Sequence, residues 1–142
     1  MERRYPSKVQ RVVDGDTIVV SIDLGFGVHL DKQTVRVGGV DTPECRTRDA
    51  REKKYGLLAK KYVETLCPKG ANVTLVVGAG NWSGKFGRTV GEIIVGEHTN
   101  LSAALITQRL AVPYDGRTSR ISNRESHERN WTYLESHPLK IE

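Results

Sequence analysis

The sequence predicts a single α+β domain, mainly β, built as a five-stranded Greek-key barrel of the OB-fold type with three α-helices. Alternating apolar residues mark five short strands, and an amphipathic helix separates the third strand from the fourth. Two further helices follow the fifth strand. The order β-β-β-α-β-β-α-α, with glycine-rich bends, favours a small barrel over a sandwich.

The length of 142 residues fits one domain, with a core over about residues 8–134 and a short tail over 135–142. A net charge of +5 and a pI of about 9.4 favour anionic partners such as nucleic acid. No apolar run is long enough for a membrane span or a secretory signal. We therefore expect a cytoplasmic monomer with reduced Cys45 and Cys67, without membrane or small-molecule cofactor.

The first two strands are expected to form a hairpin. Ser7 to Asp14 and Thr17 to Asp23 alternate with the strand period, and Asp-Gly between them is a preferred hairpin turn. Residues 24–33 are expected to form a loop or a twisted extension. Thr34 to Val40 then makes the third strand, and the Pro43 that follows ends its ladder.

The long helix is expected from Tyr55 to Cys67, because its apolar residues recur at i, i+3, i+4, i+7 and i+8. A fourth strand over Asn72–Val77 and a fifth over Arg88–Val95 follow. Residues 78–87 are expected to form the glycine-rich turn between these two strands.

The last two helices are predicted from their caps. Asn100 is expected to cap a short helix that runs to about Gln108. Ser122 and Glu125 have the spacing of a capping box, which predicts a final helix that begins at Ser122 and ends before Pro138.

Two acidic segments carry candidate metal ligands: Asp14-Gly15-Asp16-Thr17 and Asp41-Thr42-Pro43-Glu44. Either segment alone is also typical of a plain turn. Because both lie at the ends of neighbouring predicted strands, their carboxylates can converge, and hard oxygen ligands suit Ca²⁺ or Mg²⁺.

Two arginines are predicted to join these acids. Arg36 lies on the strand face opposite Val35 and Val37, and Arg88 stands at the start of the fifth strand. Strand arginines are often surface residues whose stems cover apolar area. Beside two carboxylate clusters, however, they would form a phosphate clamp, as phosphodiester cleavage requires.

Basic residues cluster in two further segments, and each cluster is equally well explained as a solvated face. The first of these clusters lies within residues 45–54. This segment has no apolar period, and we therefore interpret it as a mobile loop that binds substrate. The first cluster comprises Arg46, Arg48, Arg51, Lys53 and Lys54, and the second Arg117, Arg120, Arg124 and Arg129.

Four motifs in register resemble the staphylococcal nuclease (thermonuclease) family, in particular single-domain members of phage and bacterial type. They are Val13-Asp14-Gly15-Asp16-Thr17, the segment from Val35 to Glu44, Tyr55-Gly56 and Lys85-Phe86-Gly87-Arg88. The resemblance spans Lys8 to Leu134. It implies an OB-fold barrel with three helices and Ca²⁺-dependent hydrolysis of DNA and RNA that leaves 3′-phosphates, with little sequence specificity.

The resemblance also implies roles for individual residues. Glu44 would hold the attacking water, and Arg36 and Arg88 would bind the scissile phosphate. The implied metal ligands are Asp16, Asp41 and the Thr42 carbonyl, and the implied substrate contacts are Lys85 and Tyr114. From the basic segment 45–54, Arg46, Arg48 and Arg51 are added as expected substrate contacts. Tyr114 is also explained as a packed loop aromatic. Phe86 stands where the family prototype has tyrosine, which removes one hydroxyl.

Two other classes of protein remain as alternatives. A non-catalytic OB-fold module that binds single-stranded nucleic acid explains the basic charge, but it has no need of Glu44 together with both arginines. A protein-interaction module of the repeated kind found in larger scaffolds is disfavoured by a lone domain of this length.

Overall fold

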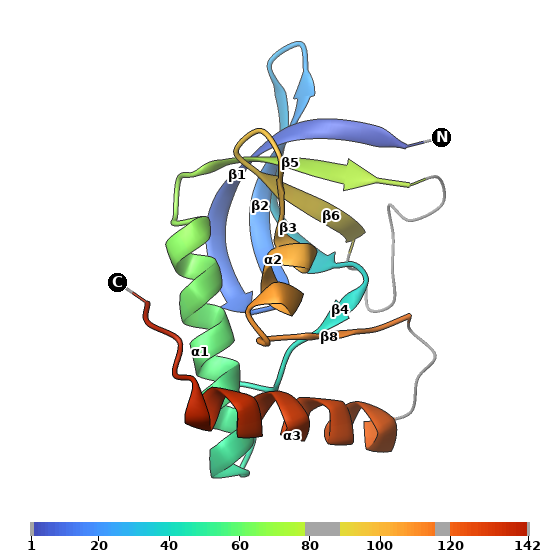
Figure 1. Cartoon of the computed structure of the whole chain (residues 1–142). Coiled ribbons are helices and arrows are strands. Elements are labelled where there is room, and N and C mark those ends of the chain that lie inside the picture. Colours follow the sequence, from blue (N-terminus) through green and yellow to red (C-terminus); the bar gives the residue numbers. More distant parts are fainter. Residues whose placement is uncertain (1, 79–88, 116–119, 142) are drawn as a thin grey trace.

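A computed structural model describes residues 2–78, 89–115 and 120–141. Within these ranges, five strands form a closed, OB-like barrel (Figure 1). Neighbours in the sheet follow the order β3-β2-β1-β5-β6, and β3 also pairs with β6 in parallel, which closes the barrel. The strands are β1 (Arg3–Asp14), β2 (Thr17–Gly25), β3 (Val28–Val37), β5 (Asn72–Val77) and β6 (Thr89–Val95). The predicted α+β fold class is confirmed.

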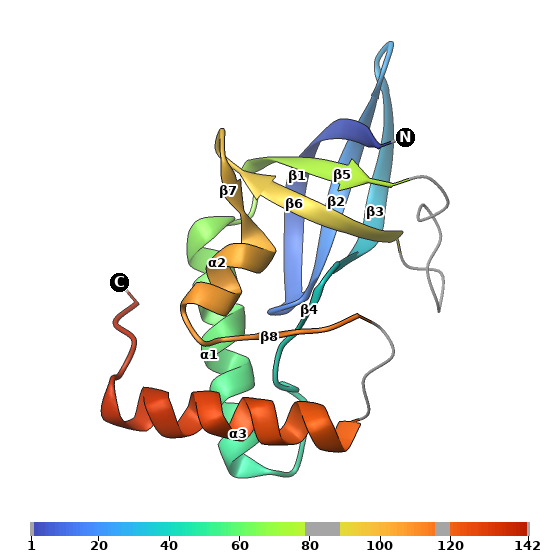
Figure 2. The ribbon, with the colours of Figure 1, turned by 45° about the vertical axis from the view of Figure 1, so that its right-hand side comes forward.

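Three helices and three short strands complete the fold in the described ranges. The helices are α1 (Ala50–Leu66), α2 (Leu101–Thr107) and α3 (Arg120–Ser136), and the short strands are β4 (Val40–Asp41), β7 (Thr99–Asn100) and β8 (Val112–Pro113). Of these strands, β7 extends the barrel sheet beside β6, while β4 and β8 form a separate two-stranded sheet. In Figure 2, α1 runs from the barrel down to α3, which crosses it, and the β4–β8 pair lies between barrel and α3. None of the helices in the described ranges is long and apolar enough to cross a membrane.

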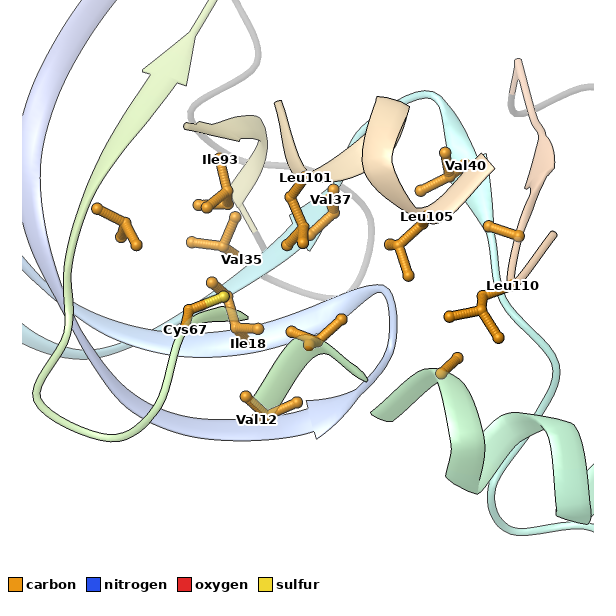
Figure 3. Close-up of a cluster of buried hydrophobic side chains, with 14 of the residues drawn as sticks. Val12, Ile18, Val35, Val37, Val40, Cys67, Ile93, Leu101, Leu105 and Leu110 are labelled. Atoms are coloured by element: carbon orange, nitrogen blue, oxygen red, sulfur yellow. The ribbon is translucent and has the colours of Figure 1, made fainter. Parts of the chain in front are cut away.

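Apolar side chains from the inner faces of the strands fill the barrel, as their alternation predicts. Ile18 and Val35 are fully buried, and they belong to one core cluster with Ile93 of β6 and Leu101 of α2 (Figure 3). Both cysteines are free and buried. Burial raises the pKa of Cys67 to about 11, so this thiol stays protonated at neutral pH.

Residues 24–33, expected as a loop or a twisted extension, belong mostly to a long hairpin of β2 and β3, so the second alternative describes them better. The chain reverses at Gly25, Phe26 and Gly27, which all have positive φ. Glycine tolerates this backbone conformation, so two glycines here allow a very tight reversal. The register between the two strands shifts twice, which breaks the regular alternation and explains why the strand period ends early in the sequence.

Helix boundaries also differ from the prediction. α1 begins at Ala50 instead of Tyr55, because the Asp49 side chain caps it by accepting from the N–H groups of Arg51 and Glu52. The expected loop over 45–54 is therefore helical from residue 50. α3 begins at Arg120, so Ser122 lies inside the helix and the predicted capping box is wrong. Asn100 caps α2 as expected, by accepting from the N–H of Ala103.

Candidate active site

The two predicted acidic segments meet at the end of the barrel beside α1 and β4. Asp16 occupies the turn between β1 and β2, and the neighbouring Thr17 pairs with Arg36 on β3. Asp41 ends β4. The Nη2 atom of Arg36 lies 3.5 Å from Asp16 Oδ2 and 3.6 Å from Asp41 Oδ1, so one guanidinium stands between two carboxylates that come from different turns.

The other side of the Arg36 guanidinium is held by backbone. Its Nη1 donates to the carbonyl oxygens of Val37 and Val40, each at 2.9 Å. These carbonyls flank the turn between β3 and β4. The arginine side chain is 17% exposed, which leaves it accessible at the edge of the acidic pair. A fixed, partly exposed guanidinium is suited to a planar two-donor contact with a phosphate group.

Asp16 is buried, and each of its two carboxylate oxygens accepts a hydrogen bond. Thr17 Oγ1 donates to its Oδ1 at 3.1 Å, and the backbone N–H of Thr42 donates to its Oδ2 at 3.1 Å. These bonds tie the first acidic segment directly to the second. The hydroxyl of Thr42 is buried without a hydrogen-bond partner among the described residues, so this polar atom is available to a water or ligand in the site.

Asp41 has a partner that the sequence reasoning missed. His127 of α3 is buried, and its Nε2 lies 3.0 Å from Asp41 Oδ2. The two residues are separated by 86 positions in the chain, so no local motif joins them. The available signal was the i, i+4 spacing of His127 and Trp131, which places both rings on one face of the last helix.

Glu44 lies on the loop that joins β4 to α1 and rests closely on the helix. Its backbone N–H donates to Glu52 Oε2 at 3.2 Å. The residue remains exposed to solvent. Partial burial of the carboxyl, and then the negative charges of its neighbours, raise the pKa of Glu44 above its usual range. The neighbouring charges are those of Asp14, Asp16, Asp41 and Glu52.

The donor set fits a hard divalent cation. Asp16 Oδ2 and Asp41 Oδ1 both lie within 3.6 Å of Arg36 Nη2, so the two carboxylates are neighbours around that nitrogen. In the described part of the chain, no three His, Cys, Asp or Glu side chains are grouped closely enough to hold a metal by themselves. An ion here would therefore complete its shell with a backbone carbonyl, waters or substrate oxygens, which Ca²⁺ and Mg²⁺ accept readily.

The predicted substrate-binding residues are placed differently. Tyr114 follows β8, and its N–H donates to Gly39 O at 2.9 Å, so it lies beside the turn that carries Arg36 and Asp41. Arg46 and Arg48 are exposed on the loop after Glu44. Lys85 and Arg88 lie outside the described residues.

Arg51 joins α1 to α3. Its Nε donates to Glu135 at 2.9 Å and its Nη2 to Thr132 Oγ1 at 3.2 Å. Arg124 makes the reciprocal bridge from α3 to Asp49. Both guanidinium groups lie over the Trp131 ring, 5.4 and 5.0 Å from its centroid. Ion pairs and rings thus hold α3 against the N-terminal half of α1.

The fold and this site define a small OB-like barrel protein with an acid–arginine site at the end of its barrel. Residues 34–136 match the family model described as staphylococcal nuclease homologue, and the chain belongs to that family. It is also 29% identical over 118 residues to "Endonuclease YhcR" of Bacillus subtilis (strain 168). That match covers 80% of this chain but spans only 9% of the length of the relative. Both similarities support a nuclease function in general terms.

Proposed function

We propose that this protein is a Ca²⁺-dependent nuclease that hydrolyses phosphodiester bonds of DNA or RNA with little sequence specificity and leaves 3′-phosphates. The observation that carries the proposal is the position of Arg36 between Asp16 and Asp41. A binding module needs cationic and aromatic groups, whereas two buried or half-buried carboxylates would repel a phosphate backbone. Such acids become useful to a phosphate-binding site when a divalent cation binds between them.

In this proposal, Asp16, Asp41 and the carbonyl of Thr42 hold the cation. When bound, the cation supplies electrostatic stabilisation of the negative charge that develops on the phosphoryl oxygens. Arg36 contributes donors to a non-bridging oxygen of the scissile phosphate, and Arg88 is assigned the same kind of contact from the family resemblance. Both contacts strengthen as charge develops in the transition state.

Glu44 is assigned to the attacking water. Its carboxylate accepts one proton as the water oxygen bonds to phosphorus, and the bond from phosphorus to the 5′ oxygen breaks. The departing 5′ oxygen then takes up a proton from solvent, while the phosphate stays on the 3′ side.

The proposed substrate class follows from the charge of the chain and the exposed loop after Glu44. A net charge of +5 attracts the phosphate backbone without reading bases. Arg46 and Arg48 are exposed next to Glu44, and no ion pair to the described residues occupies them. They are suited to neighbouring phosphates, while Tyr114 beside Gly39 is suited to stacking against a nucleotide base.

The test is incubation of the intact chain with plasmid DNA, single-stranded DNA or RNA in Ca²⁺, Mg²⁺ or EDTA. We expect cleavage in Ca²⁺ and none in EDTA, with 3′-phosphate ends detected by their resistance to polymerase extension until a phosphatase is added. Asp16→Asn should abolish Ca²⁺ binding and cleavage together. Asp31→Asn on the distant β2–β3 hairpin removes the same charge and should change neither. Tight binding of single strands without cleavage in any divalent ion would favour the non-catalytic module instead.

A further inference from the structure

The side chain of Asp41 has different partners on its two oxygens. Oδ1 lies 3.6 Å from Arg36 Nη2, on the side where Asp16 also lies, and Oδ2 lies 3.0 Å from His127 Nε2. An ionised carboxylate only accepts hydrogen bonds, so the hydrogen in the second contact belongs to the histidine. His127 therefore occupies the oxygen that points away from the acidic pair.

Burial and the backbone do little to fix the orientation of Asp41. Its side chain is 28% exposed, and it ends the two-residue strand β4. A carboxylate in such a position would rotate about χ2 and present either oxygen, or both, to a cation. The histidine contact removes this freedom.

The histidine itself is held rigidly. Its side chain is 7% exposed, and its ring stacks on Trp131 with centroids 6.0 Å apart and planes inclined by 22°. Trp131 stacks in turn on Tyr55 of α1, at 5.8 Å and 8°. The ring stack runs from α1 through α3 to the acidic pair, so His127 is placed by packing and not by its contact with Asp41 alone.

We propose that His127 is a positioning residue that donates to Oδ2 of Asp41 and thereby directs Oδ1 toward the cation. The inference rests on the proposed function, because it assigns Asp41 as a metal ligand. Carboxylate ligands are commonly oriented by such outer hydrogen bonds, and loss of one typically weakens metal affinity about 10- to 100-fold. His127 does not touch substrate, so its effect reaches the reaction only through the cation.

The test compares His127→Phe with His127→Gln by calorimetric titration of the intact chain with Ca²⁺ alone. Phenylalanine keeps a ring against Trp131 but has no donor, and we expect it to weaken Ca²⁺ binding about 10- to 100-fold. The amide of glutamine offers an N–H near the position of Nε2 and should keep the affinity within a few-fold of the parent. If His127→Phe does not fold, His127→Ala with and without added imidazole replaces it, and imidazole should restore Ca²⁺ binding.

His137→Phe is the matched control. His137 directly follows α3 and, like His127, stacks on an aromatic ring, that of Tyr133 with centroids 4.3 Å apart, but it is exposed and remote from Asp41. We expect this substitution to leave Ca²⁺ affinity unchanged. Thermal melts of all variants without metal separate a loss of folding stability from a loss of the metal site.

Three results distinguish the positioning role of His127 from its alternatives. Weaker Ca²⁺ binding in His127→Phe with retention in His127→Gln supports the proposal, and raised Ca²⁺ concentration should then restore the cleavage rate. Equal Ca²⁺ affinity of parent and His127→Phe, in a parent that binds Ca²⁺ and cleaves DNA, overturns the positioning role but leaves the nuclease proposal intact. A parent that neither binds a divalent ion nor cleaves nucleic acid overturns both.

Discussion

Gly56 of α1 lies so close to the backbone of Glu44 that a Cβ atom at position 56 would stand 2.6 Å from the Glu44 carbonyl oxygen. The same Cβ would lie 2.8 Å from the carbonyl oxygen of Pro43. Both atoms belong to backbone, which cannot move aside as the end of a flexible side chain can. Glycine at position 56 therefore sets how closely the loop bearing Glu44 rests on the helix.

Gly56→Ala should displace this loop and lower activity. Alanine in a helix interior ordinarily stabilises by up to about 1 kcal/mol relative to glycine, but overpacking against backbone costs about 1–3 kcal/mol and wins here. A shift of roughly 1 Å at a catalytic group costs on the order of 10²-fold in rate. The measurements are chemical denaturation and cleavage rate. Leu57→Ala, at an exposed position of the same helix, is the control and should alter neither strongly.

Glu44→Gln should lower kcat by about 10²- to 10⁴-fold, the usual contribution of a positioned base, while nucleic-acid affinity changes little. Single-turnover cleavage and a filter-binding titration measure the two quantities separately. An unchanged rate in a variant that still binds Ca²⁺ would remove Glu44 from the mechanism.

The same substitution should stabilise the metal-free fold at neutral pH. Because burial and four nearby carboxylates raise the pKa of Glu44, the folded state holds this proton more tightly than the unfolded state does. The ionised side chain consequently destabilises the fold as pH rises through its raised pKa, and the penalty is absent below the usual value of 4.5. Thermal melts in EDTA should show Glu44→Gln more stable by up to about 1 kcal/mol at pH 7, with no difference at pH 3.

In the variant Arg36→Lys, the lysine should not take over the contacts of the arginine. The guanidinium uses Nη1 for the carbonyls of Val37 and Val40 and Nη2 for the two carboxylates, whereas an ammonium has one nitrogen for all four partners. We expect kcat to fall by about 10²- to 10³-fold, as for loss of one transition-state donor, and KM to rise. Arg46→Lys retains the charge at an exposed position and should behave like the parent. Equal kinetics of the two variants would argue against a forked contact by Arg36.

The variant Asp49→Asn should separate the contribution of helix capping to folding stability from that of the ion pair with Arg124. Asparagine caps helices as well as aspartate does, so the bonds to the start of α1 persist while the bridge to Arg124 loses its charge. The Arg124 guanidinium lowers the pKa of Asp49, so its ionised form stabilises the fold above the usual value of 3.8. This contribution disappears as pH falls through the lowered pKa. Thermal melts should therefore show Asp49→Asn less stable at pH 7 and equal to the parent at the acid end, whereas an equal gap at every pH would indicate a capping defect.

The strands and helices that were predictable are those whose periodicity is unbroken. The alternation of Ile18, Val20 and Ile22 places all three on the inner face, and the helical spacing around Ala59 and Val63 places α1 against the barrel. The sequence leaves a loop and a twisted extension open for residues 24–33, because shifts of register put the residues of this hairpin out of phase with a simple period of two.

For the site, the acidic segments and Arg36 were predictable because each lies at a turn or on a strand whose neighbours are fixed by the hairpin. The contact of His127 with Asp41 depends on how α3 crosses the end of the barrel, and no local pattern encodes that crossing angle. Arg51 illustrates the same limit: its charge suggested substrate, but its bonds to Glu135 and Thr132 depend on the packing of two helices.

The contact between Asp41 and His127 also determines at which stage of synthesis the site can be completed. The ribosome synthesises the segment that carries Asp16, Arg36, Asp41 and Glu44 long before α3, since 86 positions separate Asp41 from His127. A nascent chain at that stage carries the acids and the guanidinium without the histidine donor or the Arg124 bridge. We expect such a chain to bind divalent ions more weakly than the full chain, because the proposed metal site is complete only once α3 has been made and has packed.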